Sequence, residues 1–259
     1  MYSAGVAPPG RAVPAFARLA AHPLRWRLLT ALAAGDHRVR ELVALVGEPQ
    51  NLVSYHLRLL RDDGLVIATR STFDGRDTYY HLDLDRCAAA LADLGAGLHP
   101  ALRPPAPAAP VRLPHAPRVA VLFLCTGNSV RSPIAEGLLR HRTGGRVDVT
   151  SAGTRPAPRR DPDAARVLRD DFGAEPPAGP PRDVGTLTGQ RFDVVVSLCD
   201  RAREAAPDFP GDPRRAHWSI PGHTGATGGT ALREIAGAID TRIRHLVPVL
   251  SAVRPAVRP

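Results

Sequence analysis

Apolar residues recur at helical spacing through the first third of the chain. In "PLRWRLLTALAAG" they predict a helix from Pro23, at its start, to Gly35, at its end. The apolar stripe of this helix consists of Leu24, Leu28, Leu29 and Leu32. The same spacing predicts a short helix over about 39–46 and a longer one between Pro49 and Gly64.

Two short strands are predicted after these helices. They are "LVIATR" and "DTYYHLDL", and they flank "STFDGR", which predicts a hairpin with Asp74-Gly75 at its tip. A further helix is predicted at about 86–94. A helix, a short helix, a turn, another helix and a β-hairpin together form the pattern of a winged helix-turn-helix.

The second half of the chain has a different pattern. "VAVLFL" (119–124) and "FDVVVSL" (192–198) are continuous apolar runs, typical of strands buried on both faces of a parallel sheet. Helices are predicted between and after them, at 134–141, 163–172 and about 231–247. Alternating strands and helices predict a doubly wound α/β domain with a parallel sheet.

A segment rich in proline and alanine separates the two patterns. Residues 95–117 carry almost no periodic apolar positions, which favours a semi-rigid linker. The chain is therefore predicted to have two domains: a mainly-α winged helix-turn-helix over 1–94 and the α/β domain over 118–259.

Composition and charge narrow the classes of function. All 34 basic residues are arginine, and the net charge is +9. Residues 118–259 hold 21 arginines against 15 acidic residues, a net +6, which suits an anionic substrate as well as DNA. No signal peptide or membrane-spanning run is recognised, and three scattered cysteines fit reduced thiols, so we expect a cytoplasmic protein without membrane contact.

The helix that starts near Pro49 is predicted to lie in the major groove of double-stranded DNA. Six of its side chains are expected to reach bases and phosphates: Gln50, Asn51, Ser54, Tyr55, His56 and Arg58. Arg70 and Arg76, beside the hairpin tip, are expected to touch the DNA backbone.

This first domain resembles the ArsR/SmtB family of bacterial repressors. The resemblance lies in "LAAHPLRWRLLTAL", "VRELVALVG", "NLVSYHLRLLRDDGLV" and "GRDTYYHL". It implies a homodimer that reads a palindromic operator, with the terminal helices forming the dimer contact. Metal- and arsenite-sensing members carry a cysteine pair in the second helix, whereas this domain has only Cys87, near the last helix, so we expect no metal site. A winged helix used only for protein contacts is the alternative.

The stretch "LCTGNSVRSPIAEG" predicts an oxyanion site. Cys125 ends an apolar strand, and Ser132-Pro133 is expected to begin a helix, with the serine as its cap. The loop between them can aim its backbone N–H groups at an anion in front of the helix N-terminus. The expected substrate-binding residues are Thr126, Gly127, Asn128, Ser129, Val130 and Arg131.

Individual residue types in this loop suit the same chemistry. Gly127 is expected to relieve backbone crowding, and Asn128 to tolerate a left-handed conformation. Arg131 can bind two oxygens of a tetrahedral anion at once. A helix N-terminus and a guanidinium favour the thiolate of Cys125, which predicts a nucleophile.

"VLFLCTGNSVRSPIAEGLL", with "VTSAGT" downstream, resembles the low-molecular-weight tyrosine phosphatases and the arsenate reductases that share their fold. The resemblance implies that Cys125 attacks phosphorus or arsenic and that Arg131 stabilises the transition state. It also implies that Ser132 supports the thiolate and that Asn128 holds the loop, with Ser151 as its partner.

Cys199 follows another predicted strand and is expected at the same sheet edge as Cys125. "TGNS", "DVVVSLC" and "HWSIPG" are closer to the arsenate-reductase branch, in which a second cysteine attacks the first. Ala206 stands where a third cysteine would complete the relay. No bound cofactor is expected; an external thiol reductant (mycothiol with mycoredoxin, glutaredoxin or thioredoxin) would finish the reaction.

The family's general acid, an Asp-Pro pair after the tryptophan segment, is replaced by Gly222-His223. Losing a general acid typically costs about 10²–10⁴-fold in rate. Arsenate reduction by Cys125 is the leading prediction. A tyrosine phosphatase, and a catalytically weak sensor of phosphate or arsenate that controls DNA binding, remain as alternatives.

Overall fold

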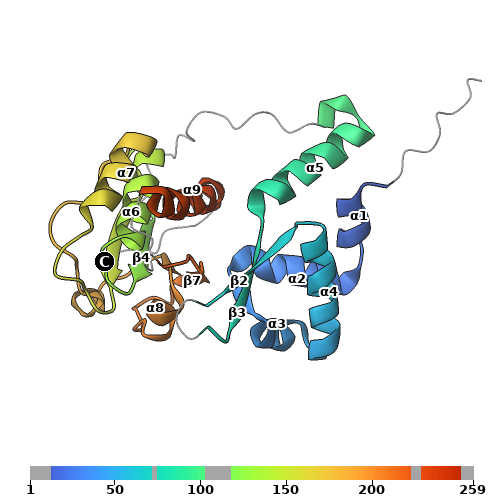
Figure 1. Cartoon of the computed structure of the whole chain (residues 1–259), viewed down its shortest axis with the longest axis horizontal. Helices are drawn as coiled ribbons and strands as arrows, with labels where there is room; N and C mark the ends of the chain where they lie inside the picture. Colours follow the sequence, from blue (N-terminus) through green and yellow to red (C-terminus); the bar gives the residue numbers. More distant parts are fainter. Residues whose placement is uncertain (1–12, 72–74, 103–117, 223–228, 252–259) are drawn as a thin grey trace, which may run out of the picture.

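The computed structural model describes residues 13–71, 75–102, 118–222 and 229–251 of the 259-residue chain. Two bodies of different architecture make up these residues (Figure 1). The first is helical with a small antiparallel sheet, and the second is built on a parallel sheet. The predicted fold class, a winged helix-turn-helix followed by an α/β domain, is confirmed.

The first body contains five α-helices and three strands within the described residues. Their bounds, with one short 3₁₀-helix, are α1 Ala15–Ala20, α2 Pro23–Ala34, β1 His37–Arg38, α3 Val39–Val46, α4 Gln50–Asp62, β2 Val66–Arg70, β3 Thr78–Leu82, α5 Leu84–Leu98 and η1 Pro100–Leu102. The sheet order is β1-β3-β2 and both pairings are antiparallel. The predicted stripe of α2 forms the core, because Leu24, Leu28, Leu29 and Leu32 are all buried.

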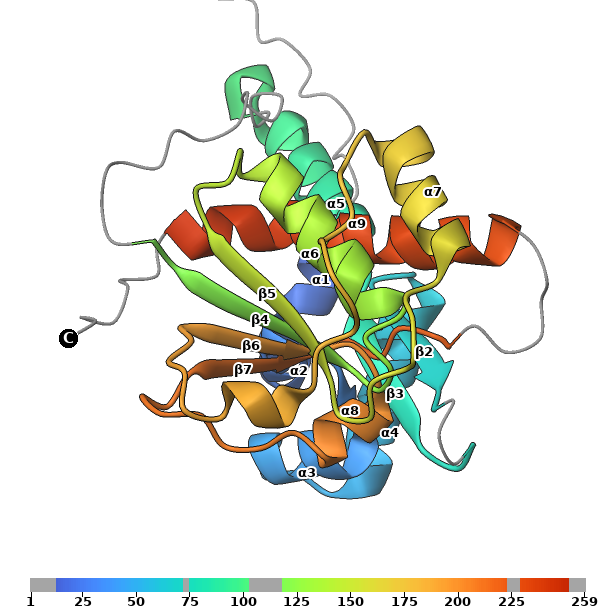
Figure 2. The same cartoon turned by 90° about the vertical axis from the view of Figure 1, so that its left-hand side faces the viewer.

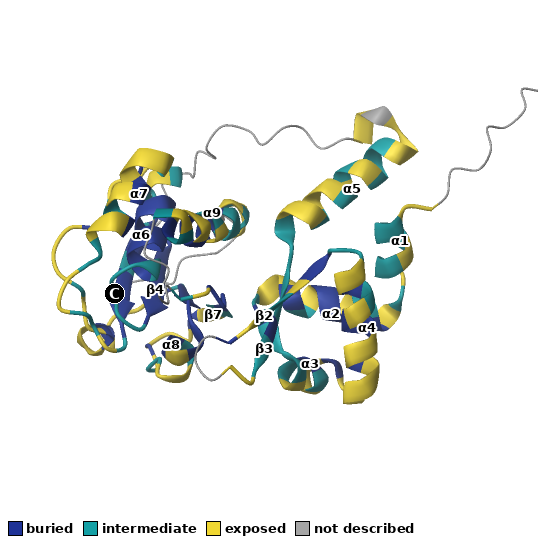
Figure 3. Cartoon of the chain, in the orientation of Figure 1, coloured by how far each residue is buried: buried dark blue, intermediate teal, exposed yellow. Residues whose placement is uncertain are grey.

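Three features of this body differ from the sequence-based prediction. Helix α1 and the two-residue strand β1 were not predicted, since neither is long enough to show a period. Helix α5 continues to Leu98, four residues into the segment expected to be linker. Neither α1 nor α5 has a fully buried residue, and both carry exposed surface (Figure 3).

The second body is a four-stranded, wholly parallel sheet in the order β5-β4-β6-β7. Its elements are β4 Ala120–Cys125, α6 Arg131–Arg142, β5 Asp148–Gly153, α7 Pro162–Phe172, η2 Val184–Leu187, β6 Val194–Ser197, α8 Asp200–Glu204, β7 Arg214–His217 and α9 Gly229–Ser251. Helices α6 and α9 lie on one side of the sheet and α8 on the other (Figure 2). All six residues of β4 are buried, as its apolar run predicts.

Two strands of this sheet were missed by the sequence analysis. Strand β7 reads "RRAH", and its first two residues are exposed because it is the edge strand. Strand β5 reads "DVTSAG" and carries only one large apolar side chain, Val149. Hydrophobic runs therefore identified the central strands β4 and β6 but not the outer ones.

The two bodies touch where the turn after α2 meets the edge strand β7. Gly35 permits the approach, because a Cβ at this position would lie 3.1 Å from the backbone nitrogen of His217. The next residue, Asp36, donates its backbone N–H to the His217 carbonyl at 2.8 Å. The described residues contain no helix with the length and apolarity needed to cross a membrane.

Candidate functional site

The predicted oxyanion loop lies between the end of β4 and the start of α6. Cys125 is the last residue of β4, and α6 begins at Arg131 with Val130 as its N-cap. A cavity of about 230 Å³ opens here. It is lined by Cys125, Gly127, Ser129, Val130 and Arg131. The cavity is large enough for a tetrahedral oxyanion in front of a helix N-terminus.

Asn128 holds the loop in shape. Its φ angle is 48°, in the left-handed region that asparagine tolerates, as predicted. Its side-chain nitrogen donates to the hydroxyls of Ser132 and Ser151, at 2.9 Å each, and its side-chain oxygen accepts from the Arg182 backbone at 2.8 Å. Asn128 is fully buried, so these three bonds satisfy its amide where water is absent.

The sulfur of Cys125 sits among polar groups. The backbone N–H of Asn128 donates to Sγ at 3.2 Å, and the hydroxyl of Ser132 lies 3.0 Å away. Ser132 does not cap α6, contrary to the sequence-based expectation, because the helix already begins at Arg131 and has no side-chain cap. Its hydroxyl is directed to the sulfur instead. Polar contacts of this kind suit a cysteine that acts as a nucleophile.

The glycine that relieves crowding at the loop is Gly153, and not Gly127 as expected. A Cβ on Gly127 would meet its nearest neighbour at 3.7 Å, an ordinary contact, so Gly127 does not relieve strain. A Cβ on Gly153 would lie 2.7 Å from the Thr126 carbonyl oxygen and 3.0 Å from the Asn128 nitrogen. Gly153 belongs to "VTSAGT", and its missing side chain lets the end of β5 pack against the loop.

Arg131 reaches across to the segment that follows β7. One terminal nitrogen, Nη1, donates to the Ile220 carbonyl at 3.1 Å. The guanidinium has further N–H donors that can meet an anion in the cavity, which Arg131 also lines. The predicted anion-binding arginine is therefore oriented by a backbone carbonyl far along the chain.

Cys199 lies beside the loop, as expected from the strand order. Strands β4 and β6 pair in parallel with Leu124 opposite Ser197, so Cys125 ends its strand and Cys199 lies just beyond the end of the neighbouring one. The Thr126 hydroxyl lies 3.3 Å from the Cys199 sulfur. Both thiols are free and buried. Continuing this register puts Cys199 level with Thr126, one residue beyond Cys125, so the two thiols lie near the same edge of the sheet.

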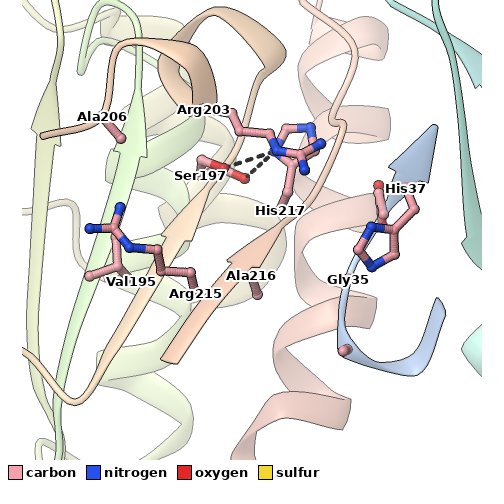
Figure 4. A pocket seen from close by; sticks show the side chains of 11 residues that line it. Gly35, His37, Val195, Ser197, Arg203, Ala206, Arg215, Ala216 and His217 are labelled. Carbon is pink, nitrogen blue, oxygen red and sulfur yellow. Dashed lines mark hydrogen bonds between the residues drawn. The ribbon is translucent and has the colours of Figure 1, made fainter. Parts of the chain in front are cut away.

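A buried polar cluster next to Cys199 was not predicted. His217 Nδ1 lies 2.8 Å from the Ser197 hydroxyl, and His217 Nε2 lies 3.1 Å from Asp200 Oδ1 (Figure 4 shows the first pair). Asp200 also accepts hydrogen bonds from the hydroxyls of Ser71 and Ser219. Burial would raise the pKa of Asp200, but the hydrogen bonds from His217, Ser71 and Ser219 outweigh it and leave the pKa below its usual value.

The cluster borders a cavity of about 310 Å³ between the two domains. Figure 4 shows His37 and Gly35 of the winged-helix domain facing His217 across it. The only sequence signals for the cluster were the acid in "CD" (199–200) and the histidine in "HW" (217–218), which lie at the ends of the neighbouring strands β6 and β7.

Most of the predicted DNA-contacting residues are accessible. Five of the six on α4 are exposed: Gln50, Asn51, Ser54, Tyr55 and Arg58. Arg70 and Arg76 are also exposed. His56 is a correction, because it is only 5% exposed and its ring packs on His22 with centroids 4.4 Å apart. Burial lowers the pKa of His56, and the charges of His22 and Arg25 act in the same direction.

No metal site appears in the part of the chain that the structure describes, where no three His, Cys, Asp or Glu side chains are grouped to hold an ion. Cys87 packs against the core of the winged-helix domain. Burial and the nearby Asp83 raise the pKa of its thiol to about 11, so it is a poor ligand at neutral pH. His223, which stands in the place of the family's Asp-Pro pair together with Gly222, lies outside the described residues.

Several solved structures are similar to about half of this chain. An arsenate reductase in its phosphate-binding state is 24% identical, with a TM-score of 0.43, covering 51% of this chain and 98% of that one. An arsenate reductase from Archaeoglobus fulgidus is 29% identical, with a TM-score of 0.42, covering 49% and 98%. A low molecular weight protein tyrosine phosphatase from T. tengcongensis is 20% identical, with a TM-score of 0.43, covering 51% and 99%.

Similar sequences include two curated arsenate reductases. One, from Halalkalibacterium halodurans, is 34% identical over 100 residues, which are 39% of this chain and 70% of the relative. Another, from Oceanobacillus iheyensis, is 32% identical over 130 residues, covering 48% of this chain and 91% of the relative.

Two family models match the chain. The low molecular weight phosphotyrosine protein phosphatase model matches residues 120–251, just over half of the chain, and the model of bacterial regulatory proteins of the arsR family matches residues 22–68. The chain therefore belongs to the low molecular weight phosphotyrosine protein phosphatase family, with an arsR-family regulatory domain joined ahead of its enzyme-family domain.

Proposed function

We propose that this protein is a DNA-binding regulator whose second domain reduces arsenate, with Cys125 as the nucleophile. The observation that carries the proposal is the pairing of an oxyanion loop with a second buried thiol, Cys199, at the end of the next strand. A phosphatase needs only the nucleophilic cysteine. A reductase also needs a further thiol, which forms a disulfide with the nucleophile and so releases arsenite. The similarity to curated arsenate reductases supports the same choice.

The proposed reaction has two thiol steps. The Cys125 thiolate attacks arsenic(V), and one arsenate oxygen leaves as water after accepting protons. The Cys199 thiolate then attacks the Cys125 sulfur, a Cys125–Cys199 disulfide forms, and arsenite leaves with the electron pair of the broken sulfur–arsenic bond. In balance, arsenate and two thiols give arsenite, one disulfide and one water. An external thiol reductant restores both thiols in a reducing compartment such as the cytoplasm.

Arg131, Ser132 and the loop amides have distinct roles in the first step. Arg131 would bind two arsenate oxygens, and the backbone N–H groups from Thr126 to Arg131 would face the others. Ser132, 3.0 Å from the Cys125 sulfur, would stabilise the thiolate by donating its hydroxyl proton in a hydrogen bond. The positive end of α6 acts in the same direction.

The test is arsenite production from arsenate by the purified protein. The reductants are mycothiol with mycoredoxin, glutathione with glutaredoxin, and thioredoxin. We expect turnover with at least one, lost by a factor of about 10⁴ or more in Cys125→Ser. Cys199→Ser should lose arsenate turnover yet keep phosphate binding. Turnover in Cys199→Ser equal to the parent would show that the external thiol attacks Cys125 directly.

A phosphate or arsenate sensor is the second candidate. Within the described residues, the five that line the oxyanion cavity include no carboxylate to protonate a leaving group. Oxyanion binding without turnover by any reductant, and without hydrolysis of an aryl phosphate, would favour the sensor. Aryl phosphate hydrolysis without arsenate reduction would favour the tyrosine phosphatase.

We also propose that helix α4 reads an operator in the major groove. Its exposed face carries amide, hydroxyl and guanidinium groups of the kinds that contact bases and phosphates, and Arg58 lies over the Tyr55 ring at 5.6 Å. Selection from a pool of random duplexes would identify the site. Arg58→Ala should then weaken binding by about 1–3 kcal/mol, whereas Arg146→Ala, on the other domain, should not.

A homodimer is proposed to form through the outer helices of the winged-helix domain. Helices α1 and α5 pack on each other but contain no buried residue, and α5 exposes Leu91 and Leu98. An exposed apolar helix face favours pairing with a second copy. Sedimentation equilibrium should give twice the chain mass for the parent and a shift towards the monomer for Leu91→Glu with Leu98→Glu.

A further inference from the structure

The contact between the two domains centres on one buried carboxylate. Asp36 of the winged-helix domain is 1% exposed. Arg242 of α9 pairs with both of its oxygens, at 2.7 and 3.0 Å, and the Ser219 backbone N–H donates to Oδ2 at 2.6 Å. A buried carboxylate is tolerated only when its charge and its hydrogen bonds are satisfied, and these contacts do so.

Ser219, which binds Asp36, directly precedes Ile220, which binds Arg131. Residues 218–220 leave the end of β7 as a tight turn, with the Ile220 N–H donating to the Trp218 carbonyl at 2.8 Å. Ser219 is fixed at its nitrogen by Asp36 and at its hydroxyl by Asp200. The carbonyl of Ile220 accepts a hydrogen bond from the Arg131 guanidinium.

We propose that Asp36 is a positioning residue for Arg131, so that the DNA-binding domain completes the oxyanion site of the enzyme domain. The inference rests on the proposed function. Arg131 can grip two anion oxygens only if its planar guanidinium is held at the right angle. Ile220 sets that angle, and Asp36 sets the position of the turn that carries Ile220.

The same contact links the anion to DNA. If undocking of the winged-helix domain frees Ser219 and weakens anion binding, then anion binding must strengthen docking by the same factor. The recognition helix α4 lies away from the contact with β7 (Figure 1), so docking leaves it accessible. Docking instead restricts the wing, because Ser71, at the end of β2, donates to Asp200 of the enzyme domain.

A second interdomain pair provides a matched control. Asp85 at the start of α5 binds Arg244 at 3.0 Å and His245 at 3.1 Å, both on α9. This pair joins the same two domains, and its hydrogen bonds within the described residues run to α9 and not to residues 218–220. Asp85→Ala therefore removes an interdomain carboxylate without touching the turn.

The experiment is calorimetric titration of the full chain with inorganic phosphate, followed by arsenate reduction kinetics. We expect Asp36→Ala to raise the phosphate Kd and the arsenate KM by about tenfold or more, because a misplaced guanidinium loses charge-assisted bonds. Asp85→Ala should stay within about twofold of the parent, as surface ion pairs contribute little. Asp36→Asn keeps an oxygen for the Ser219 N–H and should recover most of the affinity.

A folded Asp36→Ala variant with the parent's Kd and KM would overturn the proposal, as would equal losses in Asp36→Ala and Asp85→Ala. Should Asp36→Ala fail to fold, Asp36→Leu with Arg242→Met replaces the ion pair by apolar groups of similar size, a change that is often neutral for stability. That double variant lacks an acceptor for Ser219 and must still bind phosphate weakly if the proposal is right. A parent protein that binds neither phosphate nor arsenate would refute the proposed function itself.

Discussion

The two sides of the proposed active site are built in different ways. On the side of the oxyanion loop, Asn128 bonds to Ser132, Ser151 and Arg182, all within the enzyme domain. On the side of the strand ends β6 and β7, Asp200 bonds to Ser71, and Ser219 to Asp36, both from the winged-helix domain. The oxyanion loop is self-contained, because its contacts lie within one domain. The strand ends that orient Arg131 form a shared wall, because contacts from both domains hold them.

This difference separates two kinds of dependence. A self-contained loop should keep its shape whatever the winged-helix domain does, so changes in it should act on chemistry and local stability. The shared wall should respond to any change in docking. The following changes are ordered from the largest expected effect to the smallest.

Replacing Arg131 by lysine breaks the loop's own chemistry. Lysine keeps the charge but cannot bind two oxygens in one plane, so kcat/KM for arsenate should fall by about 10²–10³-fold. Steady-state arsenite production measures this. Arg140→Lys, on the outer part of the same helix, is the control and should leave the rate unchanged. A rate for Arg131→Lys close to that of the parent would remove Arg131 from the mechanism.

Removing the amide of Asn128 tests whether the loop is self-supporting. Asn128→Ala removes hydrogen bonds to two buried hydroxyls and to the Arg182 backbone, and it places a less tolerant residue at φ 48°, so the free energy of unfolding should drop by about 2–3 kcal/mol. Urea denaturation followed by circular dichroism gives the difference. Asn51→Ala, at an exposed asparagine of α4, is the control and should change it little. An equal loss in both variants would mean that the loop is not held by Asn128.

Adding a side chain at Gly35 tests the shared wall without removing a polar group. A Cβ would lie 3.1 Å from the His217 nitrogen, so Gly35→Val must push the domains apart. The backbone amides of Trp218 and Ser219 should exchange hydrogen faster, and phosphate binding should weaken by up to about tenfold. Gly97→Val on α5, where a Cβ meets nothing within 4 Å, is the matched control. Unchanged exchange at Ser219 would show that docking tolerates the added bulk.

Acid should loosen the shared wall more gently. The folded pKa of Asp200 lies below its ordinary value of 3.8, since its hydrogen bonds outweigh the effect of burial. Its contribution to the free energy of unfolding is therefore complete above the ordinary value and is lost as the pH falls through the lowered one. The stability difference between the parent and Asp200→Asn should shrink as the pH falls below the ordinary pKa of an aspartate. A difference that is constant over this range would contradict the assignment.

Sequence patterns predicted the self-contained side better than the shared one. Cys125, Asn128, Arg131 and Ser132 stand within eight residues, so their order along one loop already implied their meeting. Asp36 and Ser219 are 183 positions apart, and no periodicity connects them. Asp36 followed a glycine that was interpreted only as a helix end. Distance along the chain hides such a pair, because its meeting depends on how two domains dock.

Outer elements were missed for a related reason. β7 is polar on its exposed side, and its sequence "RRAH" has none of the apolar run that identified β4. Its position became evident only from pairing with β6. The cap expected at Ser132 was likewise wrong, because α6 already begins at Arg131 and the hydroxyl faces the Cys125 sulfur, as the family resemblance had implied.

The turn at Gly35 and Asp36 has a consequence for the solubility of the enzyme domain. It covers part of β7, the strand at one margin of the parallel sheet, and engages the His217 carbonyl there. An uncovered margin offers unpaired backbone groups to the strands of other molecules and invites aggregation. The winged-helix domain thus covers part of this edge and protects it from pairing with strands of other molecules. Separating the two domains by proteolysis would expose a surface that the intact chain keeps covered.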